Sequence, residues 1–142
     1  MTTCAAQRLL HSGKKPSYVD IKTVVKDNLK MRGVFVNKPI EQYTLIGCYQ
    51  GEISKDRMWS RNDHYLLEFT RKVNGVRETW FCDARNPKYS NWTRLINSGV
   101  LRSGTVTSLV NCKFVQTSER IYVETTRDVL AGEELLMDYE WW

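Results

Sequence analysis

Residues 127–139 read RDVLAGEELLMDY, and this stretch says more about the fold than any other part of the chain. Its residues Ala131, Gly132 and Glu133 are typical of a turn, because glycine adopts backbone conformations that other residues avoid. The apolar segment that follows, residues 135–137, is short enough to be a single strand. The stretch therefore predicts a turn followed by a short strand close to the end of the sequence.

Two β-hairpins are predicted in the region before this stretch. The dipeptide Asn74-Gly75 is the strongest short hairpin signal, and Ser118-Glu119 is a second plausible turn. The strands that flank these turns are predicted at residues 65–73 with 77–82, and at residues 110–117 with 120–125. Further candidate strands lie at residues 21–25, 34–36 and 44–53.

Evidence for helices is sparse. Residues 91–97 carry three apolar side chains at helical offsets, which predicts one helical turn, and Gly99 is expected to end it. Residues 56–63 are polar and are expected to form a loop. The pattern therefore favours a mainly β fold of several short strands.

The chain of 142 residues is long enough for one domain with a core. Residues 1–16 are polar and aperiodic and are expected to form a flexible N-terminal arm. We expect the domain itself to span residues 17–142.

The composition is that of an ordinary globular protein, with 42% hydrophobic, 26% charged and 11% aromatic residues. No apolar run approaches the roughly 20 residues of a membrane span. The first ten residues include Gln7 and Arg8 and no long apolar stretch, so they do not predict a secretory signal. These features favour an intracellular protein without a membrane partner.

The cysteines and histidines do not predict a metal site. No two cysteines form a C-x-x-C pair, and neither His11 nor His64 lies beside a cysteine. Free cysteines in the core of a protein from a reducing compartment are the better interpretation. The four are Cys4, Cys48, Cys82 and Cys112.

The formal net charge of +5 suits an acidic partner, yet the basic residues are spread along the chain. Lys14-Lys15 is the only adjacent lysine pair. One hypothesis is a basic β domain that binds nucleic acid, in which Trp59, Trp80 and Trp92 stack on bases.

Three segments, in order, resemble the SET domain of protein lysine methyltransferases. The first is RGVF at residues 32–35 with IGCYQGEI at 46–53, the second is Asp83-Ala84 with NWTRLINS at 91–98, and the third is Asn111-Cys112 with the stretch at 127–139. Each piece alone is weak, but together they cover roughly residues 33–142. The resemblance implies several small curved sheets with a knot-like threading of the C-terminal segments.

The resemblance implies methylation of a lysine on a protein substrate, with a histone tail as the expected substrate and S-adenosylmethionine as the cofactor. The chain lacks flanking cysteine clusters and so resembles compact SET proteins, including some encoded by large viruses. It also departs from the family, because Ser98 stands where the family has histidine, and residues 100–109 look like an insertion. A catalytically silent SET-like interaction module is therefore the main alternative.

By resemblance, Tyr139 is the catalytic tyrosine whose hydroxyl faces the methyl group, and Tyr49 lies at the lysine channel. Met137 and Tyr122 are expected in the substrate channel; a core methionine is the alternative for Met137. The residues expected at the cofactor are Arg32, Gly33, Phe35, Tyr65, Arg94, Asn97, Ser98 and Trp142. Asn97 has a helix-end cap as its alternative role, and Tyr65 a place in the hairpin core.

The expected surroundings are the nucleus or chromatin, or the host nucleus for a viral protein. Nucleosomal DNA and a second copy of the chain are further candidate partners. A basic enzyme acting on a basic tail would need an acidic groove, and four residues are candidates for it: Glu41, Glu52, Asp56 and Asp63.

Overall fold

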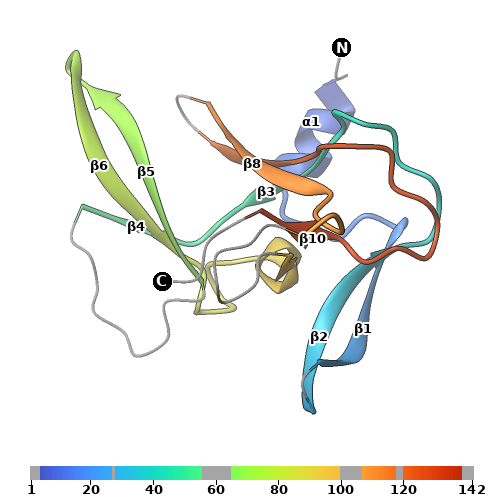
Figure 1. The fold of residues 1–142 in the computed structure, drawn as a ribbon. Coiled ribbons are helices and arrows are strands. Elements are labelled where there is room, and N and C mark those ends of the chain that lie inside the picture. Colours follow the sequence, from blue (N-terminus) through green and yellow to red (C-terminus); the bar gives the residue numbers. More distant parts are fainter. Residues whose placement is uncertain (1–3, 27, 56–64, 100–106, 118–119, 139–142) are drawn as a thin grey trace.

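The computed structural model describes residues 4–26, 28–55, 65–99, 107–117 and 120–138. These residues form three small sheets, one α-helix and one 3-10 helix (Figure 1). The fold is mainly β, as the sequence predicts. Several features predicted from the sequence lie outside the described residues: the loop at 56–63 with Asp56, Trp59 and Asp63, the turn at Ser118-Glu119, Tyr139 and Trp142.

The first sheet is an antiparallel hairpin of β1 (Val19–Lys26) and β2 (Leu29–Val36). Its strands are longer than predicted, and the positive φ of Asn28, 62°, lies in the turn between them. The hairpin projects from the body of the molecule (Figure 1). Only its base enters the core, where Val19 and Val34 are fully buried.

The second sheet has the order β4-β6-β5 and contains the hairpin predicted at Asn74-Gly75. Its strands are β4 (Glu52–Ser54), β5 (Leu66–Val73) and β6 (Val76–Asp83). Asn74 and Gly75 have φ values of 53° and 79°, as a two-residue hairpin turn requires. The single strand predicted at 44–53 is divided into β3 (Leu45–Tyr49), which pairs with β9 (Ile121–Thr125), and β4, which pairs with β6. Between them Gly51 approaches the backbone of β6 closely, since a Cβ there would lie 2.4 Å from the Asp83 carbonyl oxygen.

The third sheet has the order β3-β9-β8-β10-β7. Its strands are β3 (Leu45–Tyr49), β7 (Asn97–Ser98), β8 (Cys112–Gln116), β9 (Ile121–Thr125) and β10 (Leu136–Met137). β10 pairs in parallel with both β7 and β8, so the last described strand lies between two strands that precede it in the chain. This is the threading that the sequence resemblance implies.

Two hydrophobic clusters fill the interior. The larger joins the base of the first sheet to the third sheet and includes Val123, Val129 and Leu135, none of which is exposed. The smaller surrounds Tyr49 and Cys82, where the second and third sheets meet. Phe114 packs against both clusters and connects them.

The helical turn predicted at residues 91–97 is a 3-10 helix, Trp92–Leu95. The Asn91 side chain caps it by accepting a hydrogen bond from the Thr93 backbone N–H at 2.9 Å. The prediction that Gly99 ends the helix is wrong. The helix ends at Leu95 with Ile96 as its extended C-cap, because the next two residues extend into β7 and pair with β10.

The expectation of an irregular N-terminal arm is also corrected, because α1 (Cys4–His11) is an α-helix. Its last carbonyl, that of His11, accepts a hydrogen bond from the Gln50 side chain at 3.0 Å. The helix therefore packs against the end of β3. No helix in the described part of the chain has the length and hydrophobicity that a membrane span requires.

Candidate active site

The three segments that resemble the SET domain meet at one polar wall. The Asn97 side-chain amide donates to the Arg32 carbonyl oxygen at 3.0 Å and to the Glu134 carboxylate at 2.9 Å. A Cβ at Gly33 would lie 2.7 Å from that same carboxylate. Glycine is therefore needed here so that the side chain of Glu134 can lie against the backbone of β2.

This wall is extended by backbone pairing between β2 and the C-terminal stretch. Phe35 forms a bridge with Glu134, and the Leu135 N–H donates to the Val34 carbonyl oxygen at 2.7 Å. Phe35 also lies beneath the Lys22 ammonium, 5.2 Å from it. Four of the expected cofactor residues, Arg32, Gly33, Phe35 and Asn97, are therefore brought together.

Met137 lies next to this wall, fully inside the third sheet. It pairs with Ser98 on one side and with Cys112 on the other, and it is 1% exposed. Its carbonyl oxygen accepts from the Gly99 N–H at 2.9 Å. The half-buried Ser98 is thus one strand away from Met137.

Asn111 fixes the threaded strand in place. Its side-chain amide donates to the Glu134 carbonyl oxygen at 2.9 Å, and its side-chain oxygen accepts from the Leu136 N–H at 2.8 Å. The residue is 1% exposed, so these bonds satisfy both backbone groups away from water. Asn111 therefore determines where β10 enters the sheet.

Tyr49 belongs to an aromatic group at the junction of the second and third sheets. Its hydroxyl donates to the Tyr65 carbonyl oxygen at 2.8 Å, and its ring meets Phe114 edge-on at 5.1 Å. The Tyr65 ring in turn lies 5.1 Å from the Arg94 guanidinium. Tyr49 is 9% exposed, so its hydroxyl is held in one direction by a buried hydrogen bond.

The surroundings of Tyr122 do not support its expected place in the substrate channel. Its neighbours Ile121 and Val123 face the two core clusters, so Tyr122 points to the opposite side of β9. There its hydroxyl and the His11 Nε2 are joined by a hydrogen bond of 2.8 Å. Tyr122 therefore connects α1 to the sheet.

The expected acidic groove does not form from the described residues. Glu41 precedes β3 and Glu52 follows it, so the two carboxylates lie at opposite ends of that strand. Both side chains are exposed. Asp56 and Asp63 lie outside the described residues.

The described tryptophans do not form a base-stacking surface. Trp92 is 7% exposed and belongs to the larger core cluster. Trp80 lies between the Arg71 guanidinium at 3.7 Å and the Lys55 ammonium at 5.4 Å. Trp59 lies outside the described residues, and the described pair does not present one shared stacking face.

Three cysteines, Cys48, Cys82 and Cys112, are free and buried. Burial raises the pKa of the Cys82 thiol and of the Cys112 thiol to about 12, and it also raises that of Cys48. In the part of the chain that the structure describes, no group of three or more His, Cys, Asp or Glu residues is placed to hold a metal ion.

Three residues of this region were not among the predicted site residues: Glu134, Asn111 and Phe114. Glu134 and its neighbour Glu133 look alike in the sequence, yet they differ in role. Glu133 serves the turn, where the Leu130 N–H and the Arg127 guanidinium hold its pKa below the usual range while burial acts in the opposite direction. The pairing of Phe35 with Glu134 joins residues far apart in sequence, so no local signal separates the two glutamates.

Comparison with known proteins agrees with this geometry. The family model described as PR domain zinc finger protein 2, PR domain, matches residues 19–141. The chain belongs to the PR/SET-domain family. PR domain zinc finger protein 2 of Rattus norvegicus is 32% identical over 108 residues, 75% of this chain, and the human protein gives the same identity and coverage. The match covers only 6% of those relatives' length.

Solved structures of the family have the same fold. The methyltransferase domain of human PR domain-containing protein 2 has a TM-score of 0.71 and 25% identity, covering 100% of this chain and 89% of that one. The SET domain of ATXR5, in complex with histone H3 di-methylated on R26, has a TM-score of 0.67 and 20% identity, covering 96% of this chain and 64% of that one. The second likeness concerns the fold alone.

Proposed function

We propose that this PR/SET domain transfers methyl groups from S-adenosylmethionine to a lysine side chain of a histone. The observation that carries the proposal is the meeting of Gly33, Asn97 and Glu134 at one wall, beside the strand pair of Met137 and Ser98. The fold supports the reaction class, since the human methyltransferase domain shares it. ATXR5 was solved with histone H3, which makes histone H3 the first substrate to test.

The wall fits the charges of the proposed cofactor. S-adenosylmethionine carries positive charge on its sulfur and its amino group, and this wall offers the Glu134 carboxylate and the Arg32 carbonyl oxygen. Arg94, whose guanidinium lies 5.1 Å from the Tyr65 ring, is proposed to bind the carboxylate of the cofactor. When bound, the cofactor supplies a methyl group activated by the sulfonium.

The chain's own contribution is to prepare the lysine. Free lysine has a pKa near 10.4, whereas the reacting amine must be neutral. Apolar surroundings disfavour the ammonium form, and the two connected core clusters supply apolar side chains, those of Tyr49, Phe114 and Met137, that are proposed to border the lysine channel. The Tyr49 hydroxyl, fixed on the Tyr65 carbonyl oxygen, gives the channel a defined edge, and holding the reacting atoms in line is mainly an orientation effect.

Tyr139 is proposed as the residue whose hydroxyl faces the methyl group. In the sequence it lies two residues beyond Met137, the last residue of β10. A hydroxyl oxygen beside the methyl group stabilises the charge that moves during transfer. Trp142 is proposed to cover the cofactor.

The test is radiolabelled methyl transfer from S-adenosylmethionine to mixed core histones. We expect label on one histone and a loss of at least about tenfold with Tyr139→Phe, since mutation of a single catalytic donor costs that much or more. Tyr43→Phe is the matched control, because Tyr43 is 67% exposed and should change nothing. Equal histone labelling by the Tyr139→Phe variant and the Tyr43→Phe control would show that the Tyr139 hydroxyl takes no part in the reaction.

One observation favours a second candidate, a silent SET-like interaction module. The Asn97 side-chain amide already donates hydrogen bonds to the Arg32 carbonyl oxygen and to the Glu134 carboxylate, so the residue has a structural role that needs no cofactor. Calorimetric titration with S-adenosylmethionine, combined with the labelling assay, separates the candidates. Cofactor binding accompanied by label on a histone supports the enzyme, whereas cofactor binding without label on any histone favours the module.

Nuclear or chromatin-associated location follows from the proposed histone substrate and belongs to the same proposal. Contact with nucleosomal DNA and formation of a homodimer stay predictions from the sequence.

A further inference from the structure

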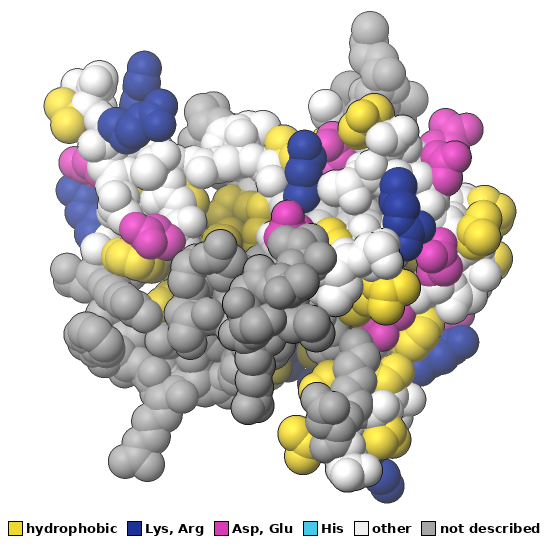
Figure 2. Space-filling model, in the orientation of Figure 1, with side chains coloured by type: hydrophobic (Ala, Val, Ile, Leu, Met, Phe, Trp, Pro, Cys, Tyr) yellow, Lys and Arg dark blue, Asp and Glu magenta, His cyan; other side chains and the backbone are white. Residues whose placement is uncertain are grey.

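A separate pocket opens between the second sheet and the facing ends of β8 and β9, next to Tyr49. It has a volume of about 180 Å³. In the space-filling view, the hollow between these two hairpins has hydrophobic side chains at its floor (Figure 2). Its described lining comprises Cys48, Tyr49, Gln50, Gly51, Ile53, Phe69, Arg71, Gln116, Thr117, Arg120 and Ile121.

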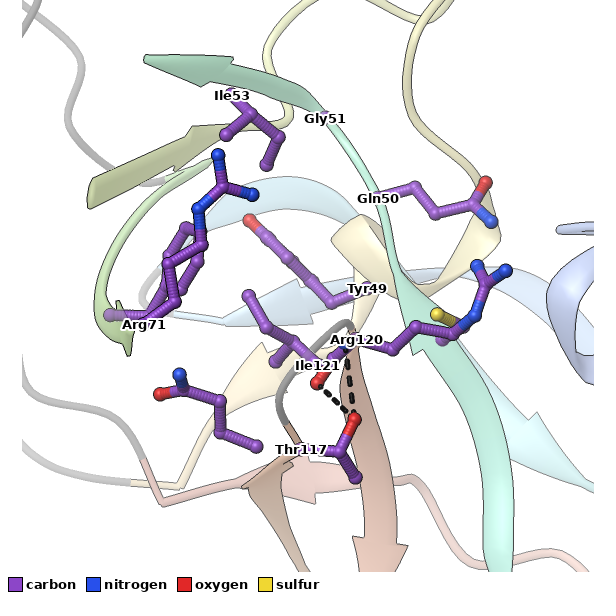
Figure 3. Close-up of a pocket in the computed structure, with 11 residues that line it drawn as sticks. Tyr49, Gln50, Gly51, Ile53, Arg71, Thr117, Arg120 and Ile121 are labelled. Carbon is purple, nitrogen blue, oxygen red and sulfur yellow. Dashed lines mark hydrogen bonds between the residues drawn. The ribbon is translucent and has the colours of Figure 1, made fainter. Parts of the chain in front are cut away.

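The charged side chains in the described lining of this pocket have one sign. Arg71 and Arg120 are the charged side chains among its described lining, and none of these residues is a carboxylate. Figure 3 shows Arg71 reaching toward Ile53 and Arg120 reaching toward Gln50, so the guanidinium groups lie at opposite ends of the pocket. A lysine or arginine side chain of a substrate would be repelled here, whereas an anion would be attracted.

Arg71 is held in position but lacks a hydrogen-bond partner at one atom. Its guanidinium stacks on Trp80 at 3.7 Å, and its Nε is buried with no partner within the described part of the chain. The carboxylate opposite it in the β5–β6 register, that of Glu78, is engaged by Lys55 at 2.9 Å and by the Trp80 indole N–H at 3.2 Å. A buried donor without a partner is costly, so the Arg71 guanidinium is incompletely satisfied by the described part of the chain.

Neighbouring contacts keep the pocket in shape. The Gln116 side-chain amide donates to the Thr70 carbonyl oxygen and so connects β8 to β5. At the other end, the Thr117 hydroxyl accepts from the Arg120 backbone N–H at 3.1 Å (Figure 3). The pocket is therefore formed before any ligand enters, which lowers the cost of binding.

We propose that this pocket recognises an acidic side chain of the substrate protein, a glutamate or aspartate close to the target lysine, with Arg71 as the group that binds it. A guanidinium presents two parallel N–H groups that match the two oxygens of a carboxylate. One guanidinium is available at each end of the pocket, which suits a single-charged carboxylate better than a phosphate. The inference rests on the proposed function, because that function places the target lysine at Tyr49, which also lines this pocket.

The test measures peptide affinity by fluorescence anisotropy, with the full chain and without requiring turnover. Labelled peptides carry one central lysine and either Glu or Gln at each of the three positions on either side of it. At one offset we expect the Glu peptide to bind about tenfold more tightly than the Gln peptide, the usual worth of a charge-assisted hydrogen bond. Arg71→Gln should abolish this difference, and Arg71→Lys should abolish most of it.

Arg77→Gln is the matched control, because it removes the same charge from an exposed position of the same hairpin and should keep the difference. Thermal unfolding of each variant establishes that it is folded. Equal affinity for Glu and Gln peptides at all offsets overturns the inference. Two further probes, a phosphoserine peptide and duplex DNA, are measured in the same way. The inference is also overturned if only the phosphoserine peptide binds more tightly than the Gln peptide, or if Arg71→Gln lowers the affinity for duplex DNA alone.

The two proposals fail separately. Preference for the Glu peptide without methyl transfer supports the pocket and counts against the enzyme. Methyl transfer without any preference for the Glu peptide supports the enzyme and overturns the pocket.

Discussion

Asn111 is almost completely buried, and its side chain joins β8 to the C-terminal stretch. Replacing it with alanine removes the hydrogen bonds that it makes to the Glu134 carbonyl oxygen and to the Leu136 N–H. Because each buried unsatisfied group costs roughly 1–3 kcal/mol, we expect Asn111→Ala to lower the free energy of unfolding by about 3 kcal/mol. Urea denaturation measures this.

Asn37→Ala is the control for that substitution. The Asn37 amide also donates to a backbone carbonyl oxygen, that of Ser17, at 3.0 Å, but from an exposed position where water replaces the lost bond. We expect a change within about 0.5 kcal/mol. If Asn111→Ala and Asn37→Ala lower the free energy of unfolding equally, the buried hydrogen bonds of Asn111 do not stabilise the fold more than an exposed one does.

Thiol chemistry gives a second prediction at the residue scale. The raised pKa values of Cys82 and Cys112, about 12 each, mean that folding favours the protonated thiols. Their contribution to stability is complete below the pKa of an unfolded thiol, about 8.5, and is lost as the pH rises from there toward 12. The folded protein should therefore lose stability in alkaline solution.

The burial that raises these pKa values is tested by thiol labelling at pH 8 in a Cys4→Ser background. We expect the three remaining cysteines to stay unlabelled in the folded protein and to react at once in denaturant, because burial blocks the thiolate. Rapid labelling of any of the three under native conditions would contradict their burial.

At the scale of elements, a substitution at Tyr122 tests whether this residue holds α1 on the sheet or takes part in catalysis. Its hydrogen bond to His11 holds α1 on the sheet, so Tyr122→Phe should lower the free energy of unfolding by about 1 kcal/mol. Methyl transfer, measured at saturating substrate, should stay within about twofold of the parent rate. A large loss of turnover with unchanged stability would return Tyr122 to the substrate channel.

The elements that could be predicted from the sequence are those with a local signal. Asn74-Gly75 dictates its turn through backbone conformation, and Asn91 caps its helix two residues away. α1 was missed because eight residues are too few for a stable isolated helix, so its stability comes from contacts with residues far along the chain. The contact of His11 with Tyr122, 111 positions apart, is of this kind.

The candidate site shows the same division. Arg32, Gly33 and Asn97 were expected at the cofactor because the family motif places them there, whereas Glu134 was not expected there. The motif does not say that Asn97 would bond to both Arg32 and Glu134. Arg71 carries no local signal, since its stacking on Trp80 and its unpartnered Nε depend on the cross-strand register of β5 and β6. Sequence patterns predict elements, whereas pockets arise where elements meet.

At the scale of the whole molecule, the C-terminal stretch connects sheets that would otherwise be separate. Leu135 is fully buried in the cluster that joins the first and third sheets, and its N–H also donates to Val34 on β2. Removing its side chain opens a cavity that both sheets share, and such changes typically cost about 2–5 kcal/mol. We therefore expect Leu135→Ala to destabilise the molecule as one unit.

The measurement is urea unfolding followed by far-UV circular dichroism and by tryptophan fluorescence. Trp92 belongs to the same cluster as Leu135, so the two midpoints should fall together and stay coincident, as one cooperative transition requires. Leu130→Ala is the matched control, since Leu130 is 65% exposed and its loss should cost at most about 0.5 kcal/mol. If the two midpoints separate in Leu135→Ala, the sheets are stable independently, and the threaded strand then serves the candidate active site rather than the stability of the whole fold.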